Sequence, residues 1–195
     1  MSLLSPDQML TPSYRVRDLT PTSTGIANIP ESNYLTPLKS MASALEELKT
    51  KLGSFRIASG YRSPEVNTAV GGSATSRHMT GEAVDIVPLM QSAEKFWASI
   101  LADTGLKNSF GEISYKAHQG SIHLTLPYSN SFGFYVKGSP RIADKESGKV
   151  VYRSLASDKI DEYLNKYGLS ITAEQAAIGL GVGVIAVGAG ALILA

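Results

Sequence analysis

The chain has 195 residues, which is enough for one domain with a hydrophobic core and too few for two domains of ordinary size. Its 18 basic and 17 acidic residues nearly balance and no long basic run is present, so we expect no nucleic-acid partner. Cysteine is absent, which excludes disulfides and thiolate ligands, so a bound metal would depend on carboxylates and on the three histidines.

The first segment, residues 1–32, is rich in proline and serine and shows no sustained hydrophobic period. We predict an extended N-terminal arm without a fold of its own, which is either a flexible tail or a segment that docks on a partner. The chain does not start with basic residues followed by an apolar run, so we expect no secretory signal peptide.

The next segment, residues 34–53, predicts an amphipathic helix. Apolar residues recur there at steps of three and four, with Pro37 near the start and Gly53 at the end: Leu38, Met41, Leu45 and Leu48. The run Phe55–Ala58 then predicts a short strand, followed by a turn at Gly60.

Further strands and helices follow along the chain. The run AVDIV, residues 83–87, predicts a buried strand, and residues 91–103 predict a helix with Phe96, Trp97 and Ile100 facing inward. Two strands are expected at residues 110–116 and 121–126, and a polar helix at 156–168, ended by Gly168. Helices and strands in this order predict an α+β domain over residues 33–168.

The C-terminal segment is apolar, and we predict a helix over residues 171–195. Residues 176–195 carry no charge and no polar side chain, and as a helix they would extend ~30 Å, about one bilayer core. Membrane insertion is the preferred interpretation, and burial among neighbouring subunits is the alternative. Its glycines would allow close helix packing in an oligomer or a pore: Gly179, Gly181, Gly183, Gly188 and Gly190.

Three residues, His78, Asp85 and His123, are candidates for binding a metal ion. His78 and Asp85 are seven positions apart, and Gly81 between them allows the chain to fold back so that both reach one ion. Asp85 lies in an apolar run, where a bound cation would stabilise the carboxylate. His123 lies in SIHLTL, whose alternation predicts Ser121, His123 and Thr125 on one face. Two imidazoles and a carboxylate suit zinc, although a hydrogen-bonded strand histidine remains the alternative.

The surrounding motifs carry a resemblance. SGYRSPEVNTAVGGSATSRHMTGEAVDIVP, followed by SIHLTL, is similar over about residues 35–127 to the zinc D-alanyl-D-alanine carboxypeptidases, a family that includes phage endolysins. The resemblance implies the fold shared with the hedgehog signalling domain, a small antiparallel sheet with flanking helices. It also implies Zn²⁺ held by His78, Asp85 and His123, and Arg62 beside the metal to stabilise negative charge on a peptidoglycan peptide.

Such an enzyme needs a general base, and here the chain departs from the family pattern. The family carboxylate often lies three residues before the last histidine, a position occupied by Gly120, or on the preceding strand, where Lys116 stands. Glu112 and His118 are the remaining candidates for acid–base catalysis. The alternative for both is a solvated strand edge or hairpin.

Two functions follow as expectations. The first is a zinc peptidase that cuts peptidoglycan stem peptides, as part of a phage virion that penetrates the cell wall. The second is a catalytically degenerate zinc-binding protein that serves a structural or wall-binding role in a virion or envelope. Both place the protein in a virion or bacterial envelope, associated with a membrane through residues 176–195, and with other virion proteins or copies of itself as partners.

Overall fold

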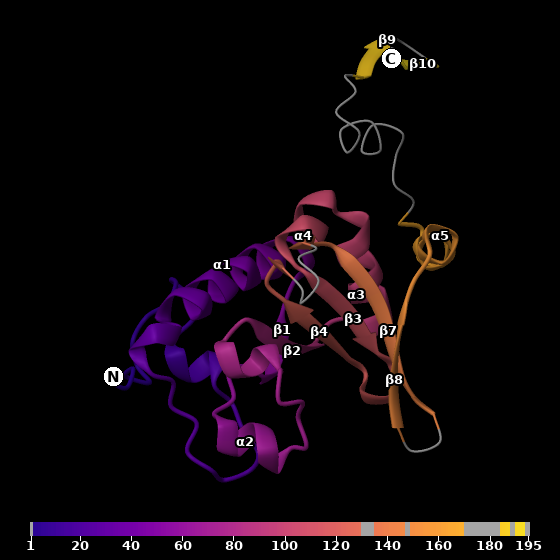
Figure 1. Cartoon of the computed structure of the whole chain (residues 1–195). Coiled ribbons are helices and arrows are strands. Elements are labelled where there is room, and N and C mark those ends of the chain that lie inside the picture. Colours follow the sequence, from indigo (N-terminus) through magenta and orange to yellow (C-terminus); the bar gives the residue numbers. More distant parts are fainter. Residues whose placement is uncertain (1, 130–134, 147–148, 170–183, 188–189, 194–195) are drawn as a thin grey trace.

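The structure is a computed structural model, and it describes residues 2–129, 135–146, 149–169, 184–187 and 190–193. Its centre is a six-stranded sheet in the order β1-β2-β4-β3-β7-β8 (Figure 1). The strands are β1 (Phe55–Ser59), β2 (Ala83–Pro88), β3 (Glu112–Lys116), β4 (Ser121–Thr125), β7 (Ser139–Glu146) and β8 (Lys149–Ser154). With helices on the sheet, the predicted α+β class is confirmed.

The sheet is mixed, so the expectation of an antiparallel sheet is wrong for one pair of strands. β3 and β7 run parallel, whereas the other neighbours run antiparallel. Strand β4 ends beside the start of β3, and a hairpin of β5 (Tyr128–Ser129) and β6 (Tyr135–Val136) follows. Strand β7 begins at this same end of the sheet, next to β3, and therefore runs in the direction of β3.

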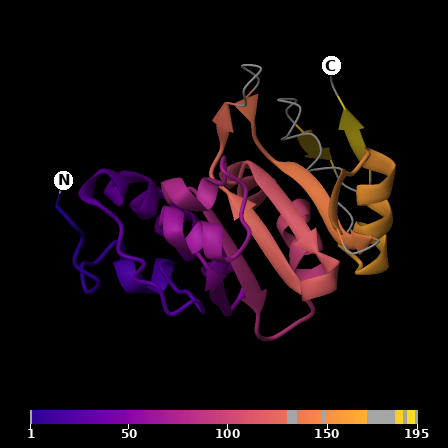
Figure 2. The same ribbon diagram turned by 60° about the horizontal axis from the view of Figure 1, so that its bottom comes forward.

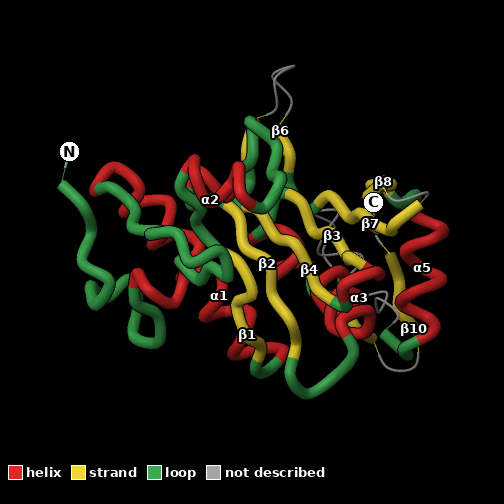
Figure 3. Tube along the Cα trace, turned by 90° about the horizontal axis from the view of Figure 1, so that it is seen from below, coloured by secondary structure: helices red, strands yellow, loops and turns green. Residues whose placement is uncertain are grey.

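Helices α1 (Leu35–Leu52) and α3 (Ala93–Ala102) lie on one side of the sheet (Figure 3), and α4 (Thr104–Ser109) packs against both of them. The helices α1 and α3 confirm their predictions, and their periodic apolar residues are buried. The indole nitrogen of Trp97 donates to the Ile113 carbonyl oxygen at 2.9 Å, which fixes α3 on β3. Helix α4 was not predicted from the sequence.

Helix α5 (Ser157–Lys166) confirms the predicted polar helix, and Gly168 follows it with a positive φ of 65°. It packs against α3, where the rings of Tyr163 and Trp97 meet edge to face at 5.2 Å. Shorter elements connect the strands: α2 (Pro64–Ala69) and the 3₁₀ turn η3 (Arg77–Thr80) lie between β1 and β2 in the chain, and the 3₁₀ turn η4 (Ala117–Gln119) joins β3 to β4.

The N-terminal segment packs on its own domain rather than forming a free tail. It contains two 3₁₀ turns, η1 (Val16–Leu19) and η2 (Ser32–Tyr34), and it lies at the end of the molecule opposite α5 (Figure 2). Five of its apolar side chains belong to the hydrophobic core: Leu4, Leu10, Tyr14, Val16 and Leu19. The arm therefore packs on the domain that follows it in the same chain.

The predicted C-terminal helix is not what the described residues form. Val184–Val187 (β9) and Gly190–Ile193 (β10) pair as antiparallel strands, so the helix prediction is wrong for these eight positions. The segment is rich in β-branched residues, which favour strand over helix, and in glycine, which weakens a helix. The rest of the predicted helix, residues 171–183, 188–189 and 194–195, lies outside the described residues. Within the part that is described, no helix is both long and apolar enough to cross a membrane.

Candidate metal centre

Asp85 lies at the middle of β2, between two strands that bring polar groups to it. On one side it pairs with His123 of β4, and on the other with Ser59, at a register shift near the end of β1. Bulges of this kind often lie next to functional sites, because they redirect the chain and its side chains. The predicted alternation of β4 is confirmed, since Ile122 and Leu124 belong to the core and His123 lines a cleft.

His78 reaches the same point from η3, which precedes β2. Gly81 ends this turn in the left-handed region with φ 72°, so the chain reverses between His78 and Asp85 as the sequence predicts. The Nδ1 atom of His78 lies 2.7 Å from the Gly60 carbonyl oxygen. A carbonyl oxygen only accepts, so Nδ1 carries the proton and Nε2 presents its lone pair toward Asp85.

These three side chains form a group suited to one metal ion. Their ligand atoms all lie within 4.8 Å of one another. His78 Nε2 is 3.5 Å from Asp85 Oδ2, and His123 Nδ1 is 2.8 Å from Asp85 Oδ1. Tetrahedral zinc with bonds of about 2.0–2.1 Å places neighbouring ligand atoms ~3.3 Å apart, between these two distances. Two histidines and one carboxylate therefore fit such an ion, and all three residues line a cleft that is open to solvent.

The protonation states also suit a metal. Burial lowers the pKa of His78 to about 3, so its imidazole is neutral at pH 7 and can act as a ligand. Burial opposes ionisation of Asp85, but the hydrogen bond with His123 and the charges around the carboxylate outweigh it. The pKa of Asp85 is therefore held below its usual range, and the carboxylate is ionised.

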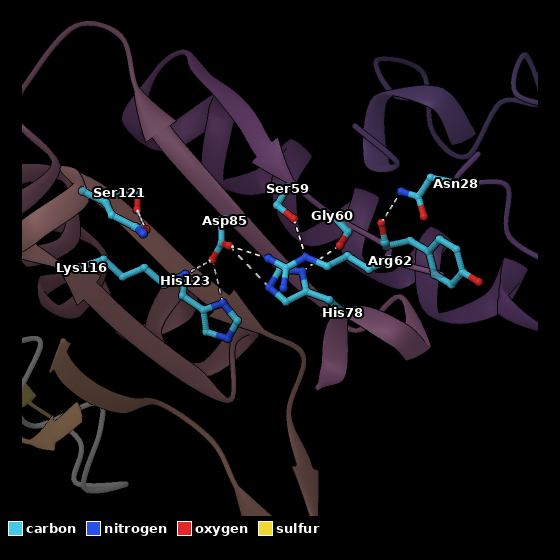
Figure 4. A network of polar contacts seen from close by, with 11 residues as sticks. Asn28, Ser59, Gly60, Arg62, His78, Asp85, Lys116, Ser121 and His123 are labelled. Atoms are coloured by element: carbon cyan, nitrogen blue, oxygen red, sulfur yellow. Dashed lines mark hydrogen bonds and ion pairs between the residues drawn. The ribbon is translucent and has the colours of Figure 1, made fainter. Parts of the chain in front are cut away.

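Two cationic side chains also contact the Asp85 carboxylate (Figure 4). Arg62 Nη2 is 3.2 Å from Oδ2, and Lys116 Nζ is 2.8 Å from Oδ1. Burial lowers the pKa of Arg62, with Asp85 acting in the opposite direction, but a guanidinium stays charged at neutral pH. The structure thus places Arg62, as the resemblance implies, and Lys116 in contact with the same carboxylate.

The site opens into a cleft of about 940 Å³, and Glu112 lies in its wall. Its carboxylate accepts a hydrogen bond from the Tyr128 hydroxyl at 3.2 Å and forms an ion pair with Arg141. Glu112 is two residues before Ser114, which pairs with His123, so it lies ~7 Å along β3 from the metal ligands. The predicted common face of Glu112 and Lys116 is confirmed, since both line this cleft.

His118 occupies a different place. It belongs to η4, and its Nδ1 atom lies 3.4 Å from the Ala143 carbonyl oxygen on β7. It is not among the described residues that line the cleft, whereas Glu112 is. Gly120, where the family pattern has a carboxylate, adopts φ 59° and ends η4. The structure therefore brings Arg62 to the metal ligands, places Glu112 in the wall of the same cleft and leaves His118 outside its lining.

Several cleft residues were missed by the sequence analysis. The guanidinium of Arg77 stacks 3.4 Å from the centre of the Tyr128 ring, and Arg141 lies 5.8 Å from the Tyr152 ring. All four line the cleft. Arg77 adjoins His78 in sequence, which was an available signal. The other three follow β4, in a region with no recognised motif, and only the sheet order brings them to the cleft.

Comparison with known protein families identifies the family of this chain. The model of the Peptidase M15 family matches residues 9–125, which is more than half of the chain. The chain belongs to the Peptidase M15 family. M15 peptidases are metal-dependent, so the family agrees with the His78–Asp85–His123 group and with a metallopeptidase-like domain. A comparison with curated proteins found no match.

The M15 segment contains the metal group together with Arg62, Glu112 and Lys116. It also extends over most of the N-terminal arm, from residue 9, so the arm belongs to the M15 domain. Arg141 and Tyr152 lie beyond the matched segment, on β7 and β8. One wall of the cleft is therefore built outside the matched segment.

Proposed function

We propose that the protein is a zinc-dependent peptidase that acts on the stem peptides of bacterial peptidoglycan. The observation that supports this most is the convergence of His78, Asp85 and His123 at the floor of an open cleft within an M15 domain. A zinc ion held there would polarise the scissile carbonyl and activate water.

The residues of the chain have separate roles in this proposal. Arg62 lies beside the metal ligands, held by Ser59 at 2.9 Å and Asp85, so its forked donors can stabilise negative charge on the reacting carbonyl oxygen. Glu112 is our candidate for the general base, because it is the carboxylate that lines the cleft without ligating the metal. His118, which lies apart from the cleft, is the weaker candidate.

Digestion of purified peptidoglycan tests this function. We expect the wild-type protein to release peptides or new amino groups, a chelator to abolish the release, and added zinc to restore it. The His78→Ala variant should lose both bound zinc and activity. Protein that binds zinc but releases no product would contradict the peptidase and support the second candidate below; protein that binds no zinc would contradict both.

The second candidate is a zinc-binding protein without catalysis, which serves a structural or wall-binding role in a virion or envelope. The observation that favours it is Lys116, whose ammonium pairs with Asp85 at 2.8 Å where a related branch has a carboxylate. Gly120 also lacks the side chain found at the other family position. In this case the protein would retain zinc and sediment with intact cell walls while leaving the peptides uncut.

For both candidates we propose a place in a phage virion or bacterial envelope, with residues 176–195 as the membrane-associating segment. The support is the uniformly apolar composition of that segment. Flotation with liposomes tests it, using the full chain and a chain ending at Leu169, which retains every residue of the hydrophobic core. Only the full chain should float. Equal flotation of both chains would contradict the proposal.

A further inference from the structure

Asn28, in the N-terminal arm, is a buried polar residue to which the proposed chemistry gives no role. Its side chain makes three hydrogen bonds, and the residue is 8% exposed. The amide nitrogen donates to the carbonyl oxygens of Thr20 at 3.0 Å and Tyr61 at 2.7 Å. The amide oxygen accepts from the Ser63 backbone nitrogen at 2.8 Å. One side chain thus clamps the backbone on both sides of Arg62.

The clamped turn, residues 60–63, is connected directly to the metal ligands. The carbonyl oxygen of Gly60 accepts from His78 Nδ1, and the Arg62 backbone nitrogen donates to the His78 carbonyl oxygen at 3.0 Å. The Arg62 side chain pairs with Asp85. This turn therefore sets the tautomer and the backbone position of His78, and it places the charge of Arg62 beside Asp85 (Figure 4).

A second contact ties the arm to the same turn. The Tyr61 backbone nitrogen donates to the Leu19 carbonyl oxygen at 2.8 Å. The approach is close, because a Cβ atom at Gly60 would lie 2.0 Å from that carbonyl oxygen. Leu19 itself is fully buried in the core. The arm thus holds the turn through backbone contacts at Leu19 and through the amide of Asn28.

We propose that Asn28 is a positioning residue for the metal centre. It acts through the backbone of Tyr61 and Ser63 to fix the turn that orients His78 and carries Arg62. The inference rests on the proposed metal-dependent function, but the effect of Asn28 on the orientation of His78 can be tested in the metal-free protein. The N-terminal arm then helps to position the metal centre, in addition to packing on the domain.

The test compares Asn28→Ala with wild type in two measurements. Zinc affinity, measured by competition with a chromophoric chelator, should fall about tenfold, the lower end of the effect of removing groups that orient metal ligands. In metal-free protein, the ¹⁵N chemical shifts of the His78 ring should show a single Nδ1-protonated tautomer for wild type and a mixture for the variant. The second measurement needs neither zinc nor activity.

Thr11→Val is the matched control. Thr11 also ties the arm to the domain, through a 2.8 Å hydrogen bond from its hydroxyl to Glu46, which lies on α1. Its removal should lower stability without changing zinc affinity or the His78 tautomer. Asn28→Asp keeps the side-chain size and the acceptor for Ser63 but loses both donors, and it replaces Asn28→Ala if that variant does not fold.

Two results would overturn the proposal. One is an Asn28 variant with wild-type zinc affinity and an unchanged His78 spectrum. The other is an equal change in the Asn28 and Thr11 variants, which would reflect general destabilisation of the arm. Failure of wild-type protein to bind zinc would instead contradict the proposed function, and the His78 spectra would still decide the role of Asn28.

Discussion

Asp85 is the residue at which the interactions of the site converge. Each of its oxygens contacts one imidazole and one cation: Oδ1 contacts His123 and Lys116, and Oδ2 contacts His78 and Arg62. A buried carboxylate is costly unless it is paired, and these partners compensate that cost. The same pairing means that a metal at this site shares its carboxylate ligand with two fixed positive charges. Zinc binding and charge pairing at Asp85 are therefore coupled.

The pKa of His78 predicts how the metal-free protein responds to acid. Its folded value of about 3 lies below the value of about 6.5 expected for the unfolded chain. The unfolded chain therefore takes up the proton first as the pH falls. The contribution of His78 to stability is complete above about pH 6.5 and is lost toward about pH 3, by up to about 1.4 kcal/mol per pH unit.

Urea unfolding with chelator present, at a series of pH values in this window, measures the effect. The His78→Gln variant lacks the titrating group, so its stability should depend less steeply on pH, by about one proton. Identical slopes for the two proteins would show that His78 is not buried in its neutral form. Asp85, whose pKa is also lowered, adds to the loss of stability only at the acidic end.

Glu112 can be tested as a base separately from its ion pair with Arg141. The Glu112→Gln variant should lower kcat at least ~100-fold if the carboxylate moves a proton, because general bases contribute about this much. The Arg141→Met variant removes the same ion pair but keeps the carboxylate, so it should retain most of kcat even if the changed cleft wall raises KM. Peptide release from peptidoglycan is the measurement. Equal losses in both variants would assign Glu112 a structural role.

At the scale of single residues, the convergence of the candidate metal group could be predicted because its signal is local. His78, Gly81 and Asp85 lie in one short motif, and the alternation of β4 orients His123. The role of Asn28 could not be predicted, because it depends on contacts with residues 33 and 35 positions away. The pairing of Lys116 with Asp85 likewise required the register of three strands.

At the scale of elements, the turn at residues 60–63 is the feature most sensitive to change. Gly60→Ala would place its Cβ atom against the Leu19 carbonyl oxygen, a backbone atom held in η1. We expect a loss of about 1–3 kcal/mol in the free energy of unfolding, as for other overpacked sites. Urea unfolding measures it.

Gly105→Ala is the control for this prediction. It lies in α4, where the new methyl group would meet only the side-chain ends of Asp103, Lys51 and Glu47. A helical alanine is favoured over glycine by about 1 kcal/mol, so stability should stay unchanged or rise. Unchanged stability of Gly60→Ala would show that the arm yields to the added methyl group and does not hold the turn firmly. A similar loss in both variants would show that the loss at Gly60 does not come from this contact.

The predicted elements were those with a regular hydrophobic period. Helices α1 and α3 bury one stripe, and β2 is a short apolar run interrupted only by Asp85, so each could be recognised. The strands β7 and β8 were missed because their sequences are polar, and Pro140 also argued against a strand. For the glycine-rich C-terminal segment, the helix was predicted from the length of the apolar run alone. An apolar run can form either a helix or strands, and its described residues form strands.

At the scale of the whole molecule, the cleft combines two parts of the chain. Its floor and metal ligands come from the segment shared with the M15 family, and Arg141 and Tyr152 come from β7 and β8, beyond that segment. The candidate metal ligands and one wall of the cleft therefore come from separate segments of the chain. If the cleft holds a peptide as proposed, substitutions at Arg141 or Tyr152 should change which peptide binds without touching the metal ligands.

The parallel pairing of β7 with β3 also affects solubility. Over Glu112–Lys116, β7 covers backbone groups that would otherwise be the free edge of the sheet. Exposed edges pair readily with other chains. A chain cut after Leu126, close to the end of the family match, should therefore self-associate and precipitate more readily than a chain ending at Leu169. Light scattering at increasing concentration compares the two, and equal scattering would show that β7 does not protect this edge.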